Sequence, residues 1–414
     1  DSEDATYLMM VAHYDSRYSQ PMPKDTVWSY GAADDGYGVG VILETVSQLL
    51  KQRQDWCQGV KVLFTDAEEV GMMGMKAIWE NDRAVFDNVG FMINIEARGP
   101  FGPALLFEAC PGNEKVMQLY EDAAAYPYTY SLTTVVYGFM PNFTDFTIVK
   151  DEIPGLNFST IADVNHYHTD LDNFSNVHPA SIQHYGAQVL PIAEKYLTSD
   201  EFSATDALKA EDDTVNFTIP ALGLFNFSKM GYTIFNVVIF LVFLIGFALE
   251  GLRGRIKAAK VFRQSCLVLI SSIAVLAVGE LVAYVCAYVS GAVFKPFGIV
   301  QGIPFDNAAM IASVAVMAVI SIFVYIAFRN RAVRAVSGSM RASAAINAAR
   351  HYAGNSLYGT MALMFVLSLA LLLAIGENLM FFIPLVCASV AMMLYRLLPV
   401  RVWLLAAMVL ILLH

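Results

Sequence analysis

Hydrophobic positions divide the chain into two parts with different patterns. Up to about residue 200, short apolar runs that suit strands alternate with longer segments whose apolar positions recur at helical spacing. The strand-like runs are 7–12, 60–65, 89–96, 104–108 and 155–159, and the helix-like segments are 38–53, 113–124 and 179–197. This alternation predicts an α/β domain, a three-layer α/β/α arrangement with a mostly parallel sheet. In such a domain the functional groups gather at the carboxyl ends of the strands.

The second part consists of long apolar runs. Crossing about 30 Å of hydrocarbon takes roughly 20 apolar residues in a helix. Runs of this kind occupy 230–249, 264–289, 307–328, 356–375 and 379–395, and a sixth at 402–413 is cut short by the end of the chain. We therefore expect an extracytoplasmic domain at 1–200, a linker at 201–228 and an all-α transmembrane bundle of about six helices at 229–414, the last one truncated.

Basic residues indicate the orientation of this membrane part. They cluster after the first and third runs, and such loops usually face the cytoplasm. The two clusters are Arg253, Arg255, Lys257, Lys260 and Arg263, and Arg329, Arg331, Arg334, Arg341 and Arg350. The pattern predicts a multi-pass integral membrane protein whose first 228 residues lie outside the cytoplasm, at a bacterial cell membrane or on the lumenal side of the endoplasmic reticulum or vacuole in a eukaryote. Glu280, inside the second run, has either a functional or a purely structural role in the bundle.

Charge and cysteine content narrow the choice of function. Residues 1–213 contain 33 acidic and 12 basic residues, whereas residues 214–414 contain 4 and 14. An acidic domain argues against a nucleic-acid partner and suits a site that collects cations. The five cysteines, three of them in apolar runs, indicate neither a disulfide framework nor a thiolate metal cluster. Because the chain begins at Asp1 rather than at a methionine, we expect that an N-terminal part of the domain precedes it.

Five Asn-Phe-Ser/Thr sequons accompany the acidic part of the chain. They begin at Asn142, Asn157, Asn173, Asn216 and Asn226. Such sequons fit a glycosylated lumenal domain. Asn157, however, falls in a predicted buried strand, and Asn226 lies next to the first apolar run. We therefore leave open whether any of them carries a glycan.

Candidate metal ligands follow the predicted strands. His13 ends the first strand, and Asp15 two residues later can fix the tautomer of a zinc-bound imidazole. Asp34 and Asp35 stand among glycines just before a helix, where one reading is a helix cap and the other is a carboxylate that bridges two metal ions. The remaining candidates also follow strands: Glu68-Glu69, Asn94-Ile-Glu96 and His166-Tyr-His168-Thr-Asp170-Leu-Asp172. Together they supply the nitrogen and oxygen donors that zinc sites use.

The order of these motifs resembles the co-catalytic di-zinc aminopeptidase family. The resemblance rests on His-x-Asp, Gly-Ala-x-Asp-Asp-Gly, the Glu-Glu pair followed by glycine, Asn-x-Glu, and Tyr-His with an aspartate four residues on, and it covers residues 7–197. Within that family, Asn-Ile-Glu-Ala-Arg-Gly and the multispanning tail look most like the membrane branch. That branch includes the endoplasmic reticulum metallopeptidase, the vacuolar membrane protease and bacterial relatives.

The resemblance implies a role for each candidate. Asp34 would bridge two Zn²⁺ ions, His13 and Glu96 would complete one site, and Glu69 and His168 would complete the other. Glu68 would act as general base toward a metal-bridging hydroxide. The resemblance further implies that Asp15 and Asp172 orient the histidines and that Tyr167 helps to hold the oxyanion.

The activity that the resemblance implies is that of a membrane-anchored di-zinc metallopeptidase, an aminopeptidase that hydrolyses the N-terminal residues of peptides. Its partners would be peptides with a free N-terminus and the lipid bilayer, with no nucleic acid, while the oligomeric state stays open. One alternative is a glutaminyl cyclase-like acyltransferase with a single zinc, against which the pair His13 and Asp15 argues. Another is a non-catalytic binding or assembly protein on the same fold, which would lack metal ligands.

Overall fold

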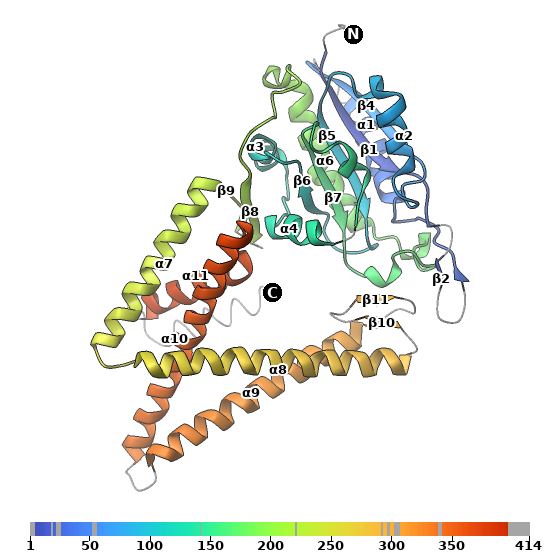
Figure 1. Ribbon diagram of the computed structural model, residues 1–414. Helices are drawn as coiled ribbons and strands as arrows, with labels where there is room; N and C mark the ends of the chain where they lie inside the picture. Colours follow the sequence, from blue (N-terminus) through green and yellow to red (C-terminus); the bar gives the residue numbers. More distant parts are fainter. Residues whose placement is uncertain are drawn as a thin grey trace. The chain divides into compact units, whose positions relative to one another are not determined.

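The chain forms two compact units, one made largely of residues up to Tyr232 and the other largely of residues from Thr233 onward. The computed structural model (Figure 1) describes residues 5–17, 20–21, 26–51, 56–140, 142–219, 222–290, 293–295, 299–301, 307–337 and 342–395. Each unit is considered by itself below.

The first unit is built on a five-stranded sheet with the order β4-β1-β5-β7-β6. Its strands are β1 (Tyr7–His13), β4 (Gly59–Thr65), β5 (Val89–Ala97), β6 (Leu105–Ala109) and β7 (Gly155–Thr160). Neighbouring strands are parallel except for β6, which runs antiparallel to β7 at the edge. All nine residues of β5 are buried, as expected for a strand covered on both faces.

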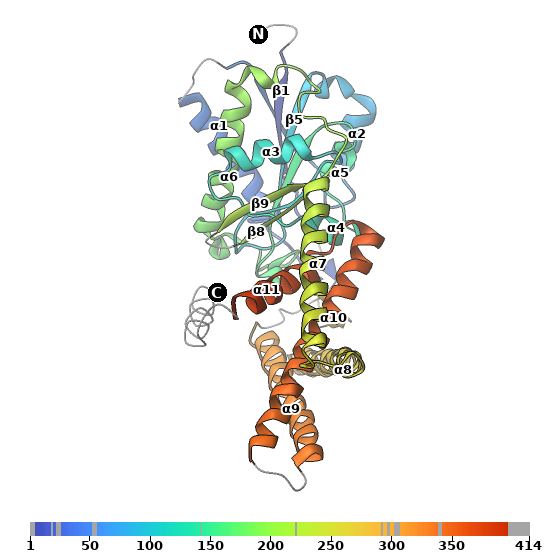
Figure 2. The same cartoon turned by 90° about the vertical axis from the view of Figure 1, so that its left-hand side faces the viewer.

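Helices cover both faces of this sheet, which completes the three layers. They are α1 (Gly36–Lys51), α2 (Met73–Asn81), α3 (Glu114–Ala123), α4 (Ser131–Phe139), α5 (Asp145–Val149) and α6 (Pro179–Thr198). Figure 2 shows α1 and α6 on one side of β1 and β5, with α2 and α5 on the other. The predicted α/β fold with a mostly parallel sheet is thus confirmed, and the five predicted strands and three predicted helices of this domain all form.

The chain crosses from β4 over β1 to β5, so the order of strands reverses between β1 and β5. In open α/β sheets, ligands bind outside the carboxyl ends of the strands at such a switch point. Tyr185 of α6 holds this edge together, because its hydroxyl donates to the Glu96 carbonyl oxygen at 2.6 Å and accepts from the Thr160 amide at 2.5 Å. The carboxyl ends of β1 and β5 are therefore held in fixed positions at the switch point.

Residues 201–228, expected to be a linker, contain an antiparallel hairpin. Its strands are β8 (Thr214–Ile219) and β9 (Gly223–Ser228). Val215 and Phe217 are buried, and the Thr218 amide donates to the Thr129 carbonyl oxygen at 2.9 Å. Asn216 is also buried, so neither it nor Asn157, whose side chain is wholly buried in β7, is accessible to a glycan in the folded domain.

The second unit is helical. Its helices are α7 (Lys229–Leu252), α8 (Ala258–Ser290), α9 (Asn307–Ser337), α10 (Ala342–Ile375) and α11 (Leu379–Tyr395). Within the residues that the structure describes, three segments are long and apolar enough to cross a membrane: Lys229–Leu252, Ala258–Val282 and Gly354–Ile375. Shorter apolar segments, Ala315–Phe328 and Leu379–Val390, lie in α9 and α11. The expected sixth helix at 402–413 lies outside the described residues.

Candidate metal centre

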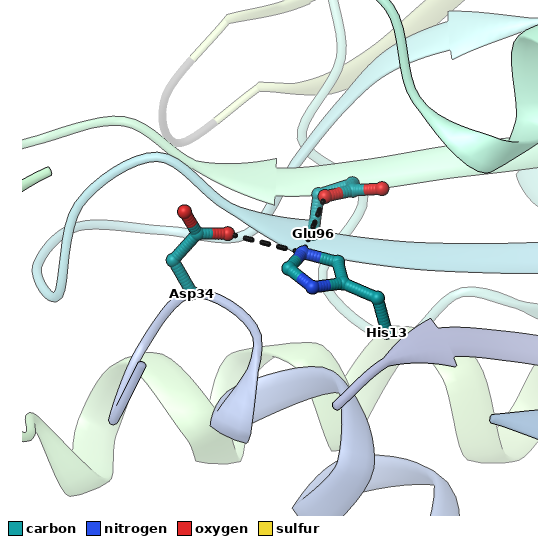
Figure 3. Close-up of side chains that lie close together, drawn as sticks. All are labelled: His13, Asp34 and Glu96. Carbon is teal, nitrogen blue, oxygen red and sulfur yellow. Dashed lines mark ion pairs between the residues drawn. The ribbon is translucent and has the colours of Figure 1, made fainter. Parts of the chain in front are cut away.

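Five side chains from separate segments converge at the carboxyl ends of the strands. His13 ends β1 and Glu96 lies in β5, while the loops before α1, after β4 and after β7 bring Asp34, Glu69 and His168. His13 Nε2 lies 3.3 Å from Asp34 Oδ1 and 3.5 Å from Glu96 Oε2 (Figure 3). On the other side of Asp34, His168 Nε2 lies 3.3 Å from Asp34 Oδ2 and 2.8 Å from Glu69 Oε2. Two three-residue donor groups therefore share Asp34, one oxygen to each.

The two adjacent aspartates before α1 have different tasks. Asp35 turns back to cap the helix, and its Oδ1 accepts from the Gly38 amide at 3.0 Å. A side chain at position 38 would displace this cap, since a Cβ there would lie 2.2 Å from Asp35 Oδ2. Asp34 points the other way, between the two histidines. The helix cap and the shared carboxylate, two alternatives from the sequence, thus both occur, on neighbouring residues.

Asp15 supports His13 and also the glutamate pair. Its carbonyl oxygen lies 2.9 Å from His13 Nδ1, and because a carbonyl can only accept, Nδ1 carries the proton and Nε2 is left facing the carboxylates. The Asp15 carboxylate accepts from the amides of Glu68 at 3.0 Å and Glu69 at 3.2 Å. Ala67, with φ 58°, supplies the left-handed turn that precedes these two residues.

His168 is held in an unusual backbone conformation. Its φ is 58°, a region that costs a non-glycine residue roughly 1–2 kcal/mol. The ring stacks on that of Tyr167, with centroids 3.6 Å apart, so each ring restricts the orientation of the other. Strain of this kind concentrates at functional sites, where the surrounding structure enforces it.

Asp172 supports Asp34 rather than a histidine. Its carboxylate accepts from the amides of Ala33 at 2.7 Å and Asp34 at 3.2 Å and lies 3.4 Å from the Ser29 hydroxyl. The role that the resemblance implied for Asp172, orienting a histidine, is therefore wrong. The carboxylate is used instead because the loop before α1 has main-chain donors that no helix or strand satisfies.

A chain of buried polar side chains behind Glu96 was not predicted from the sequence. Asn94 Nδ2 donates to Glu96 Oε1 and to Asn157 Oδ1, both at 3.0 Å. Asn157 Nδ2 donates in turn to Glu108 Oε2 at 3.0 Å, and Lys150 Nζ lies 2.6 Å from Glu108 Oε1. The only signal in the sequence is an asparagine in the middle of each of two apolar strands. This chain fixes the direction of the Glu96 carboxylate.

The electrostatics of the cluster favour bound cations. Burial would lower the pKa of His168, but its contacts with Asp34 and Glu69 raise that pKa to about 9. Burial also raises the pKa of Glu68 to about 10, with the charge of Glu96 adding to the effect. Among the described residues, Asp34 Oδ2, Glu69 Oε1 and His168 Nε2 are buried and make no hydrogen bond, although His168 Nε2 lies close to both carboxylates. Imidazole and carboxylate donors left in this way fit zinc, which takes nitrogen and oxygen ligands.

A cavity of about 450 Å³ opens beside the donor groups. Asp34, Glu68 and Glu96 form its polar end, and Tyr167 and Arg98 also line it. The remaining wall is mostly apolar and comes largely from α4 and the loop after it, with Leu132, Val136, Met140 and Phe143 among its residues. A small organic molecule can therefore reach Glu68 and the shared carboxylate from this side.

Comparison with known proteins shows which family the first part of the chain resembles. Residues 1–193 match the sequence model described as "Peptidase family M28". The human endoplasmic reticulum metallopeptidase 1 is 30% identical over 223 residues, which is 53% of this chain and 23% of that protein. The vacuolar membrane protease of Verticillium alfalfae is 32% identical over 184 residues, 43% of this chain and 16% of that protein. The chain thus spans less than a quarter of the length of these two relatives.

Solved structures with a similar arrangement include a zinc aminopeptidase from Bacillus subtilis and a glutaminyl cyclase from Porphyromonas gingivalis. The first aligns with a TM-score of 0.36 and 17% identity over 51% of each chain. The second aligns with a TM-score of 0.36 and 20% identity over 47% of this chain and 75% of the cyclase. From the sequence match and the membrane relatives, the predicted resemblance is confirmed: the domain at residues 1–193 belongs to peptidase family M28, a family of zinc metallopeptidases.

Proposed function

We propose that this chain is a membrane-anchored aminopeptidase that uses two zinc ions. The observation that carries the proposal is the pair of donor groups that share Asp34. His13, Asp34 and Glu96 would hold one ion, and Asp34, Glu69 and His168 the other. Two ions with a common carboxylate would polarise the scissile carbonyl and lower the pKa of an attacking water. Two complete donor groups favour this function over an acyltransferase with a single zinc.

Glu68 is the residue we assign to proton transfer. Its carboxylate lines the cavity next to Asp34 and Glu96, and no metal-donor group includes it. Two bound cations beside Glu68 would lower its raised pKa. The carboxylate would then take a proton from the attacking water and deliver it to the departing amine. Its main chain is fixed by Asp15, which keeps the carboxylate beside the donor groups. Tyr167, on the same wall, would donate its hydroxyl proton to the carbonyl oxygen as negative charge develops there.

Exopeptidase action requires the free amino group of the substrate to be held near the scissile bond. The carboxylates at the polar end of the cavity supply the negative charge for this. The apolar helices of the second unit would anchor the domain, and the basic loops favour an extracytoplasmic position for it.

Replacing Glu68 with glutamine tests the assignment. We expect turnover of a peptide with a free N-terminus to fall by roughly 10²- to 10⁴-fold, because the amide cannot accept the proton. Zinc content should stay unchanged, as Glu68 is not a ligand. The matched control is Glu80→Gln, on an exposed position of α2, which should behave as the unmodified protein.

Three results would contradict the proposal. Undiminished activity of Glu68→Gln would remove Glu68 from the reaction. Equal cleavage of N-acetylated and free peptides would indicate an endopeptidase. Conversion of an N-terminal glutamine to pyroglutamate, with release of ammonia and no peptide hydrolysis, would favour the cyclase-like alternative.

A further inference from the structure

Arg98 stands where a strand ends beside the proposed zinc sites. It follows β5 directly, two residues after Glu96, and residues two apart on an extended segment share a face. Its amide donates to the Thr160 carbonyl oxygen at 2.8 Å and to Ser159 Oγ at 3.1 Å, so its backbone is fixed to β7. The side chain lines the same cavity as Glu68. A cation is thus held at the wall of a site otherwise rich in carboxylates.

The guanidinium group of Arg98 lacks a protein counterion in the part of the chain that the structure describes. No described carboxylate lies within 4.0 Å of it, and its buried Nε has no hydrogen-bond partner. Its one assigned side-chain contact is the Tyr167 ring, whose centroid is 5.4 Å from the guanidinium carbon. A partly buried cation is costly unless it is paired. The group is therefore available to an anion that enters the cavity.

Chemistry of the cavity wall limits what that anion can be. Arg98 is the sole basic residue among the described residues that line it, and the carboxylates of Asp34, Glu68 and Glu96 line it as well. Most of the remaining wall is apolar. The cavity therefore suits a molecule with a cationic end, an apolar body and an anionic end. A short peptide has this distribution of charge, since its amino group and its carboxylate lie at opposite ends.

Distance decides the length of such a peptide. The guanidinium carbon lies 5.4 Å from the Tyr167 ring, whose centroid is 3.6 Å from that of His168. The two distances bound the separation between the guanidinium carbon and the His168 ring centroid at 9.0 Å. An extended peptide advances roughly 3.3–3.6 Å per residue. One or two residues beyond the scissile carbonyl are therefore enough to bring a C-terminal carboxylate to Arg98.

We propose that Arg98 binds a carboxylate of the substrate, and that the preferred substrates are dipeptides and tripeptides with a free C-terminal carboxylate. This inference rests on the proposed aminopeptidase function and specifies its substrate class. A guanidinium recognises a carboxylate through two parallel N–H donors. An acidic side chain of the N-terminal residue offers the same chemistry, and the experiment separates these two sources of the carboxylate.

The test measures binding with the full chain carrying Glu68→Gln, which keeps zinc but does not consume the peptide. Three probes are titrated by calorimetry: leucyl-leucine, leucyl-leucinamide and glutamyl-leucinamide. Adding Arg98→Met should weaken the binding of leucyl-leucine roughly 10- to 100-fold, or about 1.4–2.8 kcal/mol. The affinity for leucyl-leucinamide should change by no more than about twofold. In the protein with native Glu68, Arg98→Met should raise KM for leucyl-leucine and largely preserve kcat.

Arg83→Met is the matched control. Arg83 also lies over an aromatic ring, 3.9 Å from Trp79, but it is exposed and pairs with Glu152. Its replacement should change the binding of none of the three probes. This control separates loss of the Arg98 contact from a general effect of removing a guanidinium from an aromatic face.

Each outcome bears on the inference. Equal weakening of the acid and the amide would overturn it, because Arg98 would then only pack against Tyr167. Failure of the Glu68→Gln protein to prefer the acid over the amide would overturn it as well. A loss confined to glutamyl-leucinamide would support the carboxylate contact but reject the short-peptide preference. Arg98-dependent binding of leucyl-leucine without hydrolysis by the native protein would leave this inference standing while the proposed aminopeptidase function failed.

Discussion

Replacing Asp172 with alanine should weaken both proposed zinc sites at once. Asp172 contacts neither histidine; it holds the loop that carries Asp34 through the amides of Ala33 and Asp34. Asp34 offers one oxygen to each donor group. A change that releases this loop therefore acts on two sites through a single residue, although Asp172 would bind no metal itself.

The size of the effect follows from the contacts that are lost. Removing a buried acceptor leaves two main-chain donors unpaired, at roughly 1–3 kcal/mol each. Asp172 is only 2% exposed, so water replaces it poorly. We expect the folded domain to lose about 2–6 kcal/mol of stability. Residues that orient a ligand change metal affinity roughly 10- to 100-fold, and this factor should apply to each site.

The assay is a competition titration of zinc against a chromophoric chelator, with thermal unfolding measured in parallel. Asp170→Ala is the control, since Asp170 lies two residues earlier and is exposed. It should leave both affinities unchanged. Weakening of one zinc site alone would refute the reasoning, because a shared carboxylate cannot be displaced from one site and stay in place for the other.

Two further changes test other parts of the site. His13→Ala should remove one zinc per chain and keep the second, which Asp34, Glu69 and His168 would still hold. Elemental analysis of the purified protein measures the zinc content. A single zinc that is unaffected by the change would favour a one-zinc enzyme. Gly38→Ala should lower the stability of the domain by about 0.5–2 kcal/mol, because it displaces the Asp35 cap. Gly40→Ala should be neutral or stabilising, since a Cβ there would meet nothing within 4 Å. Denaturation midpoints that rank the two variants in the opposite order would contradict this account of the cap.

The ends of the strands and the residue types that could bind metal could be predicted from the sequence, because both depend on residues that are close together in the chain. His13 and Glu96 each lie at the end of an apolar run, and parallel strands bring such ends to one edge of the sheet. The resemblance then supplied the pairing of ligands, which hydrophobic periodicity alone does not contain. The sequence did not decide between Asp34 and Asp35, since which of two adjacent carboxylates turns inward depends on a loop conformation that has no periodic signal.

Contacts between segments that are distant in the chain could not be predicted from the sequence. Asp172 meets Ala33 across 139 positions, and Asn94 meets Asn157 across 63. Helix α4, which forms much of the apolar cavity wall, has only nine residues and contains four consecutive β-branched ones, so its sequence does not favour a helix. In the sequence, Arg98 is only one residue of the Asn-Ile-Glu-Ala-Arg-Gly motif. Its lack of a described counterion depends on the folded structure and not on its neighbours along the chain.

The asparagine pair behind Glu96 has a consequence for how this domain can evolve. Asn94 and Asn157 bind each other across adjacent strands, and each also serves a different acidic side chain. A change at one position alone leaves a buried donor or acceptor without a hydrogen-bond partner, so single substitutions there are selected against. Lineages can diverge at this place only when positions 94, 108 and 157 change together. These three positions should therefore covary among homologues, whereas the metal ligands, each fixed by its own chemistry, should not vary at all.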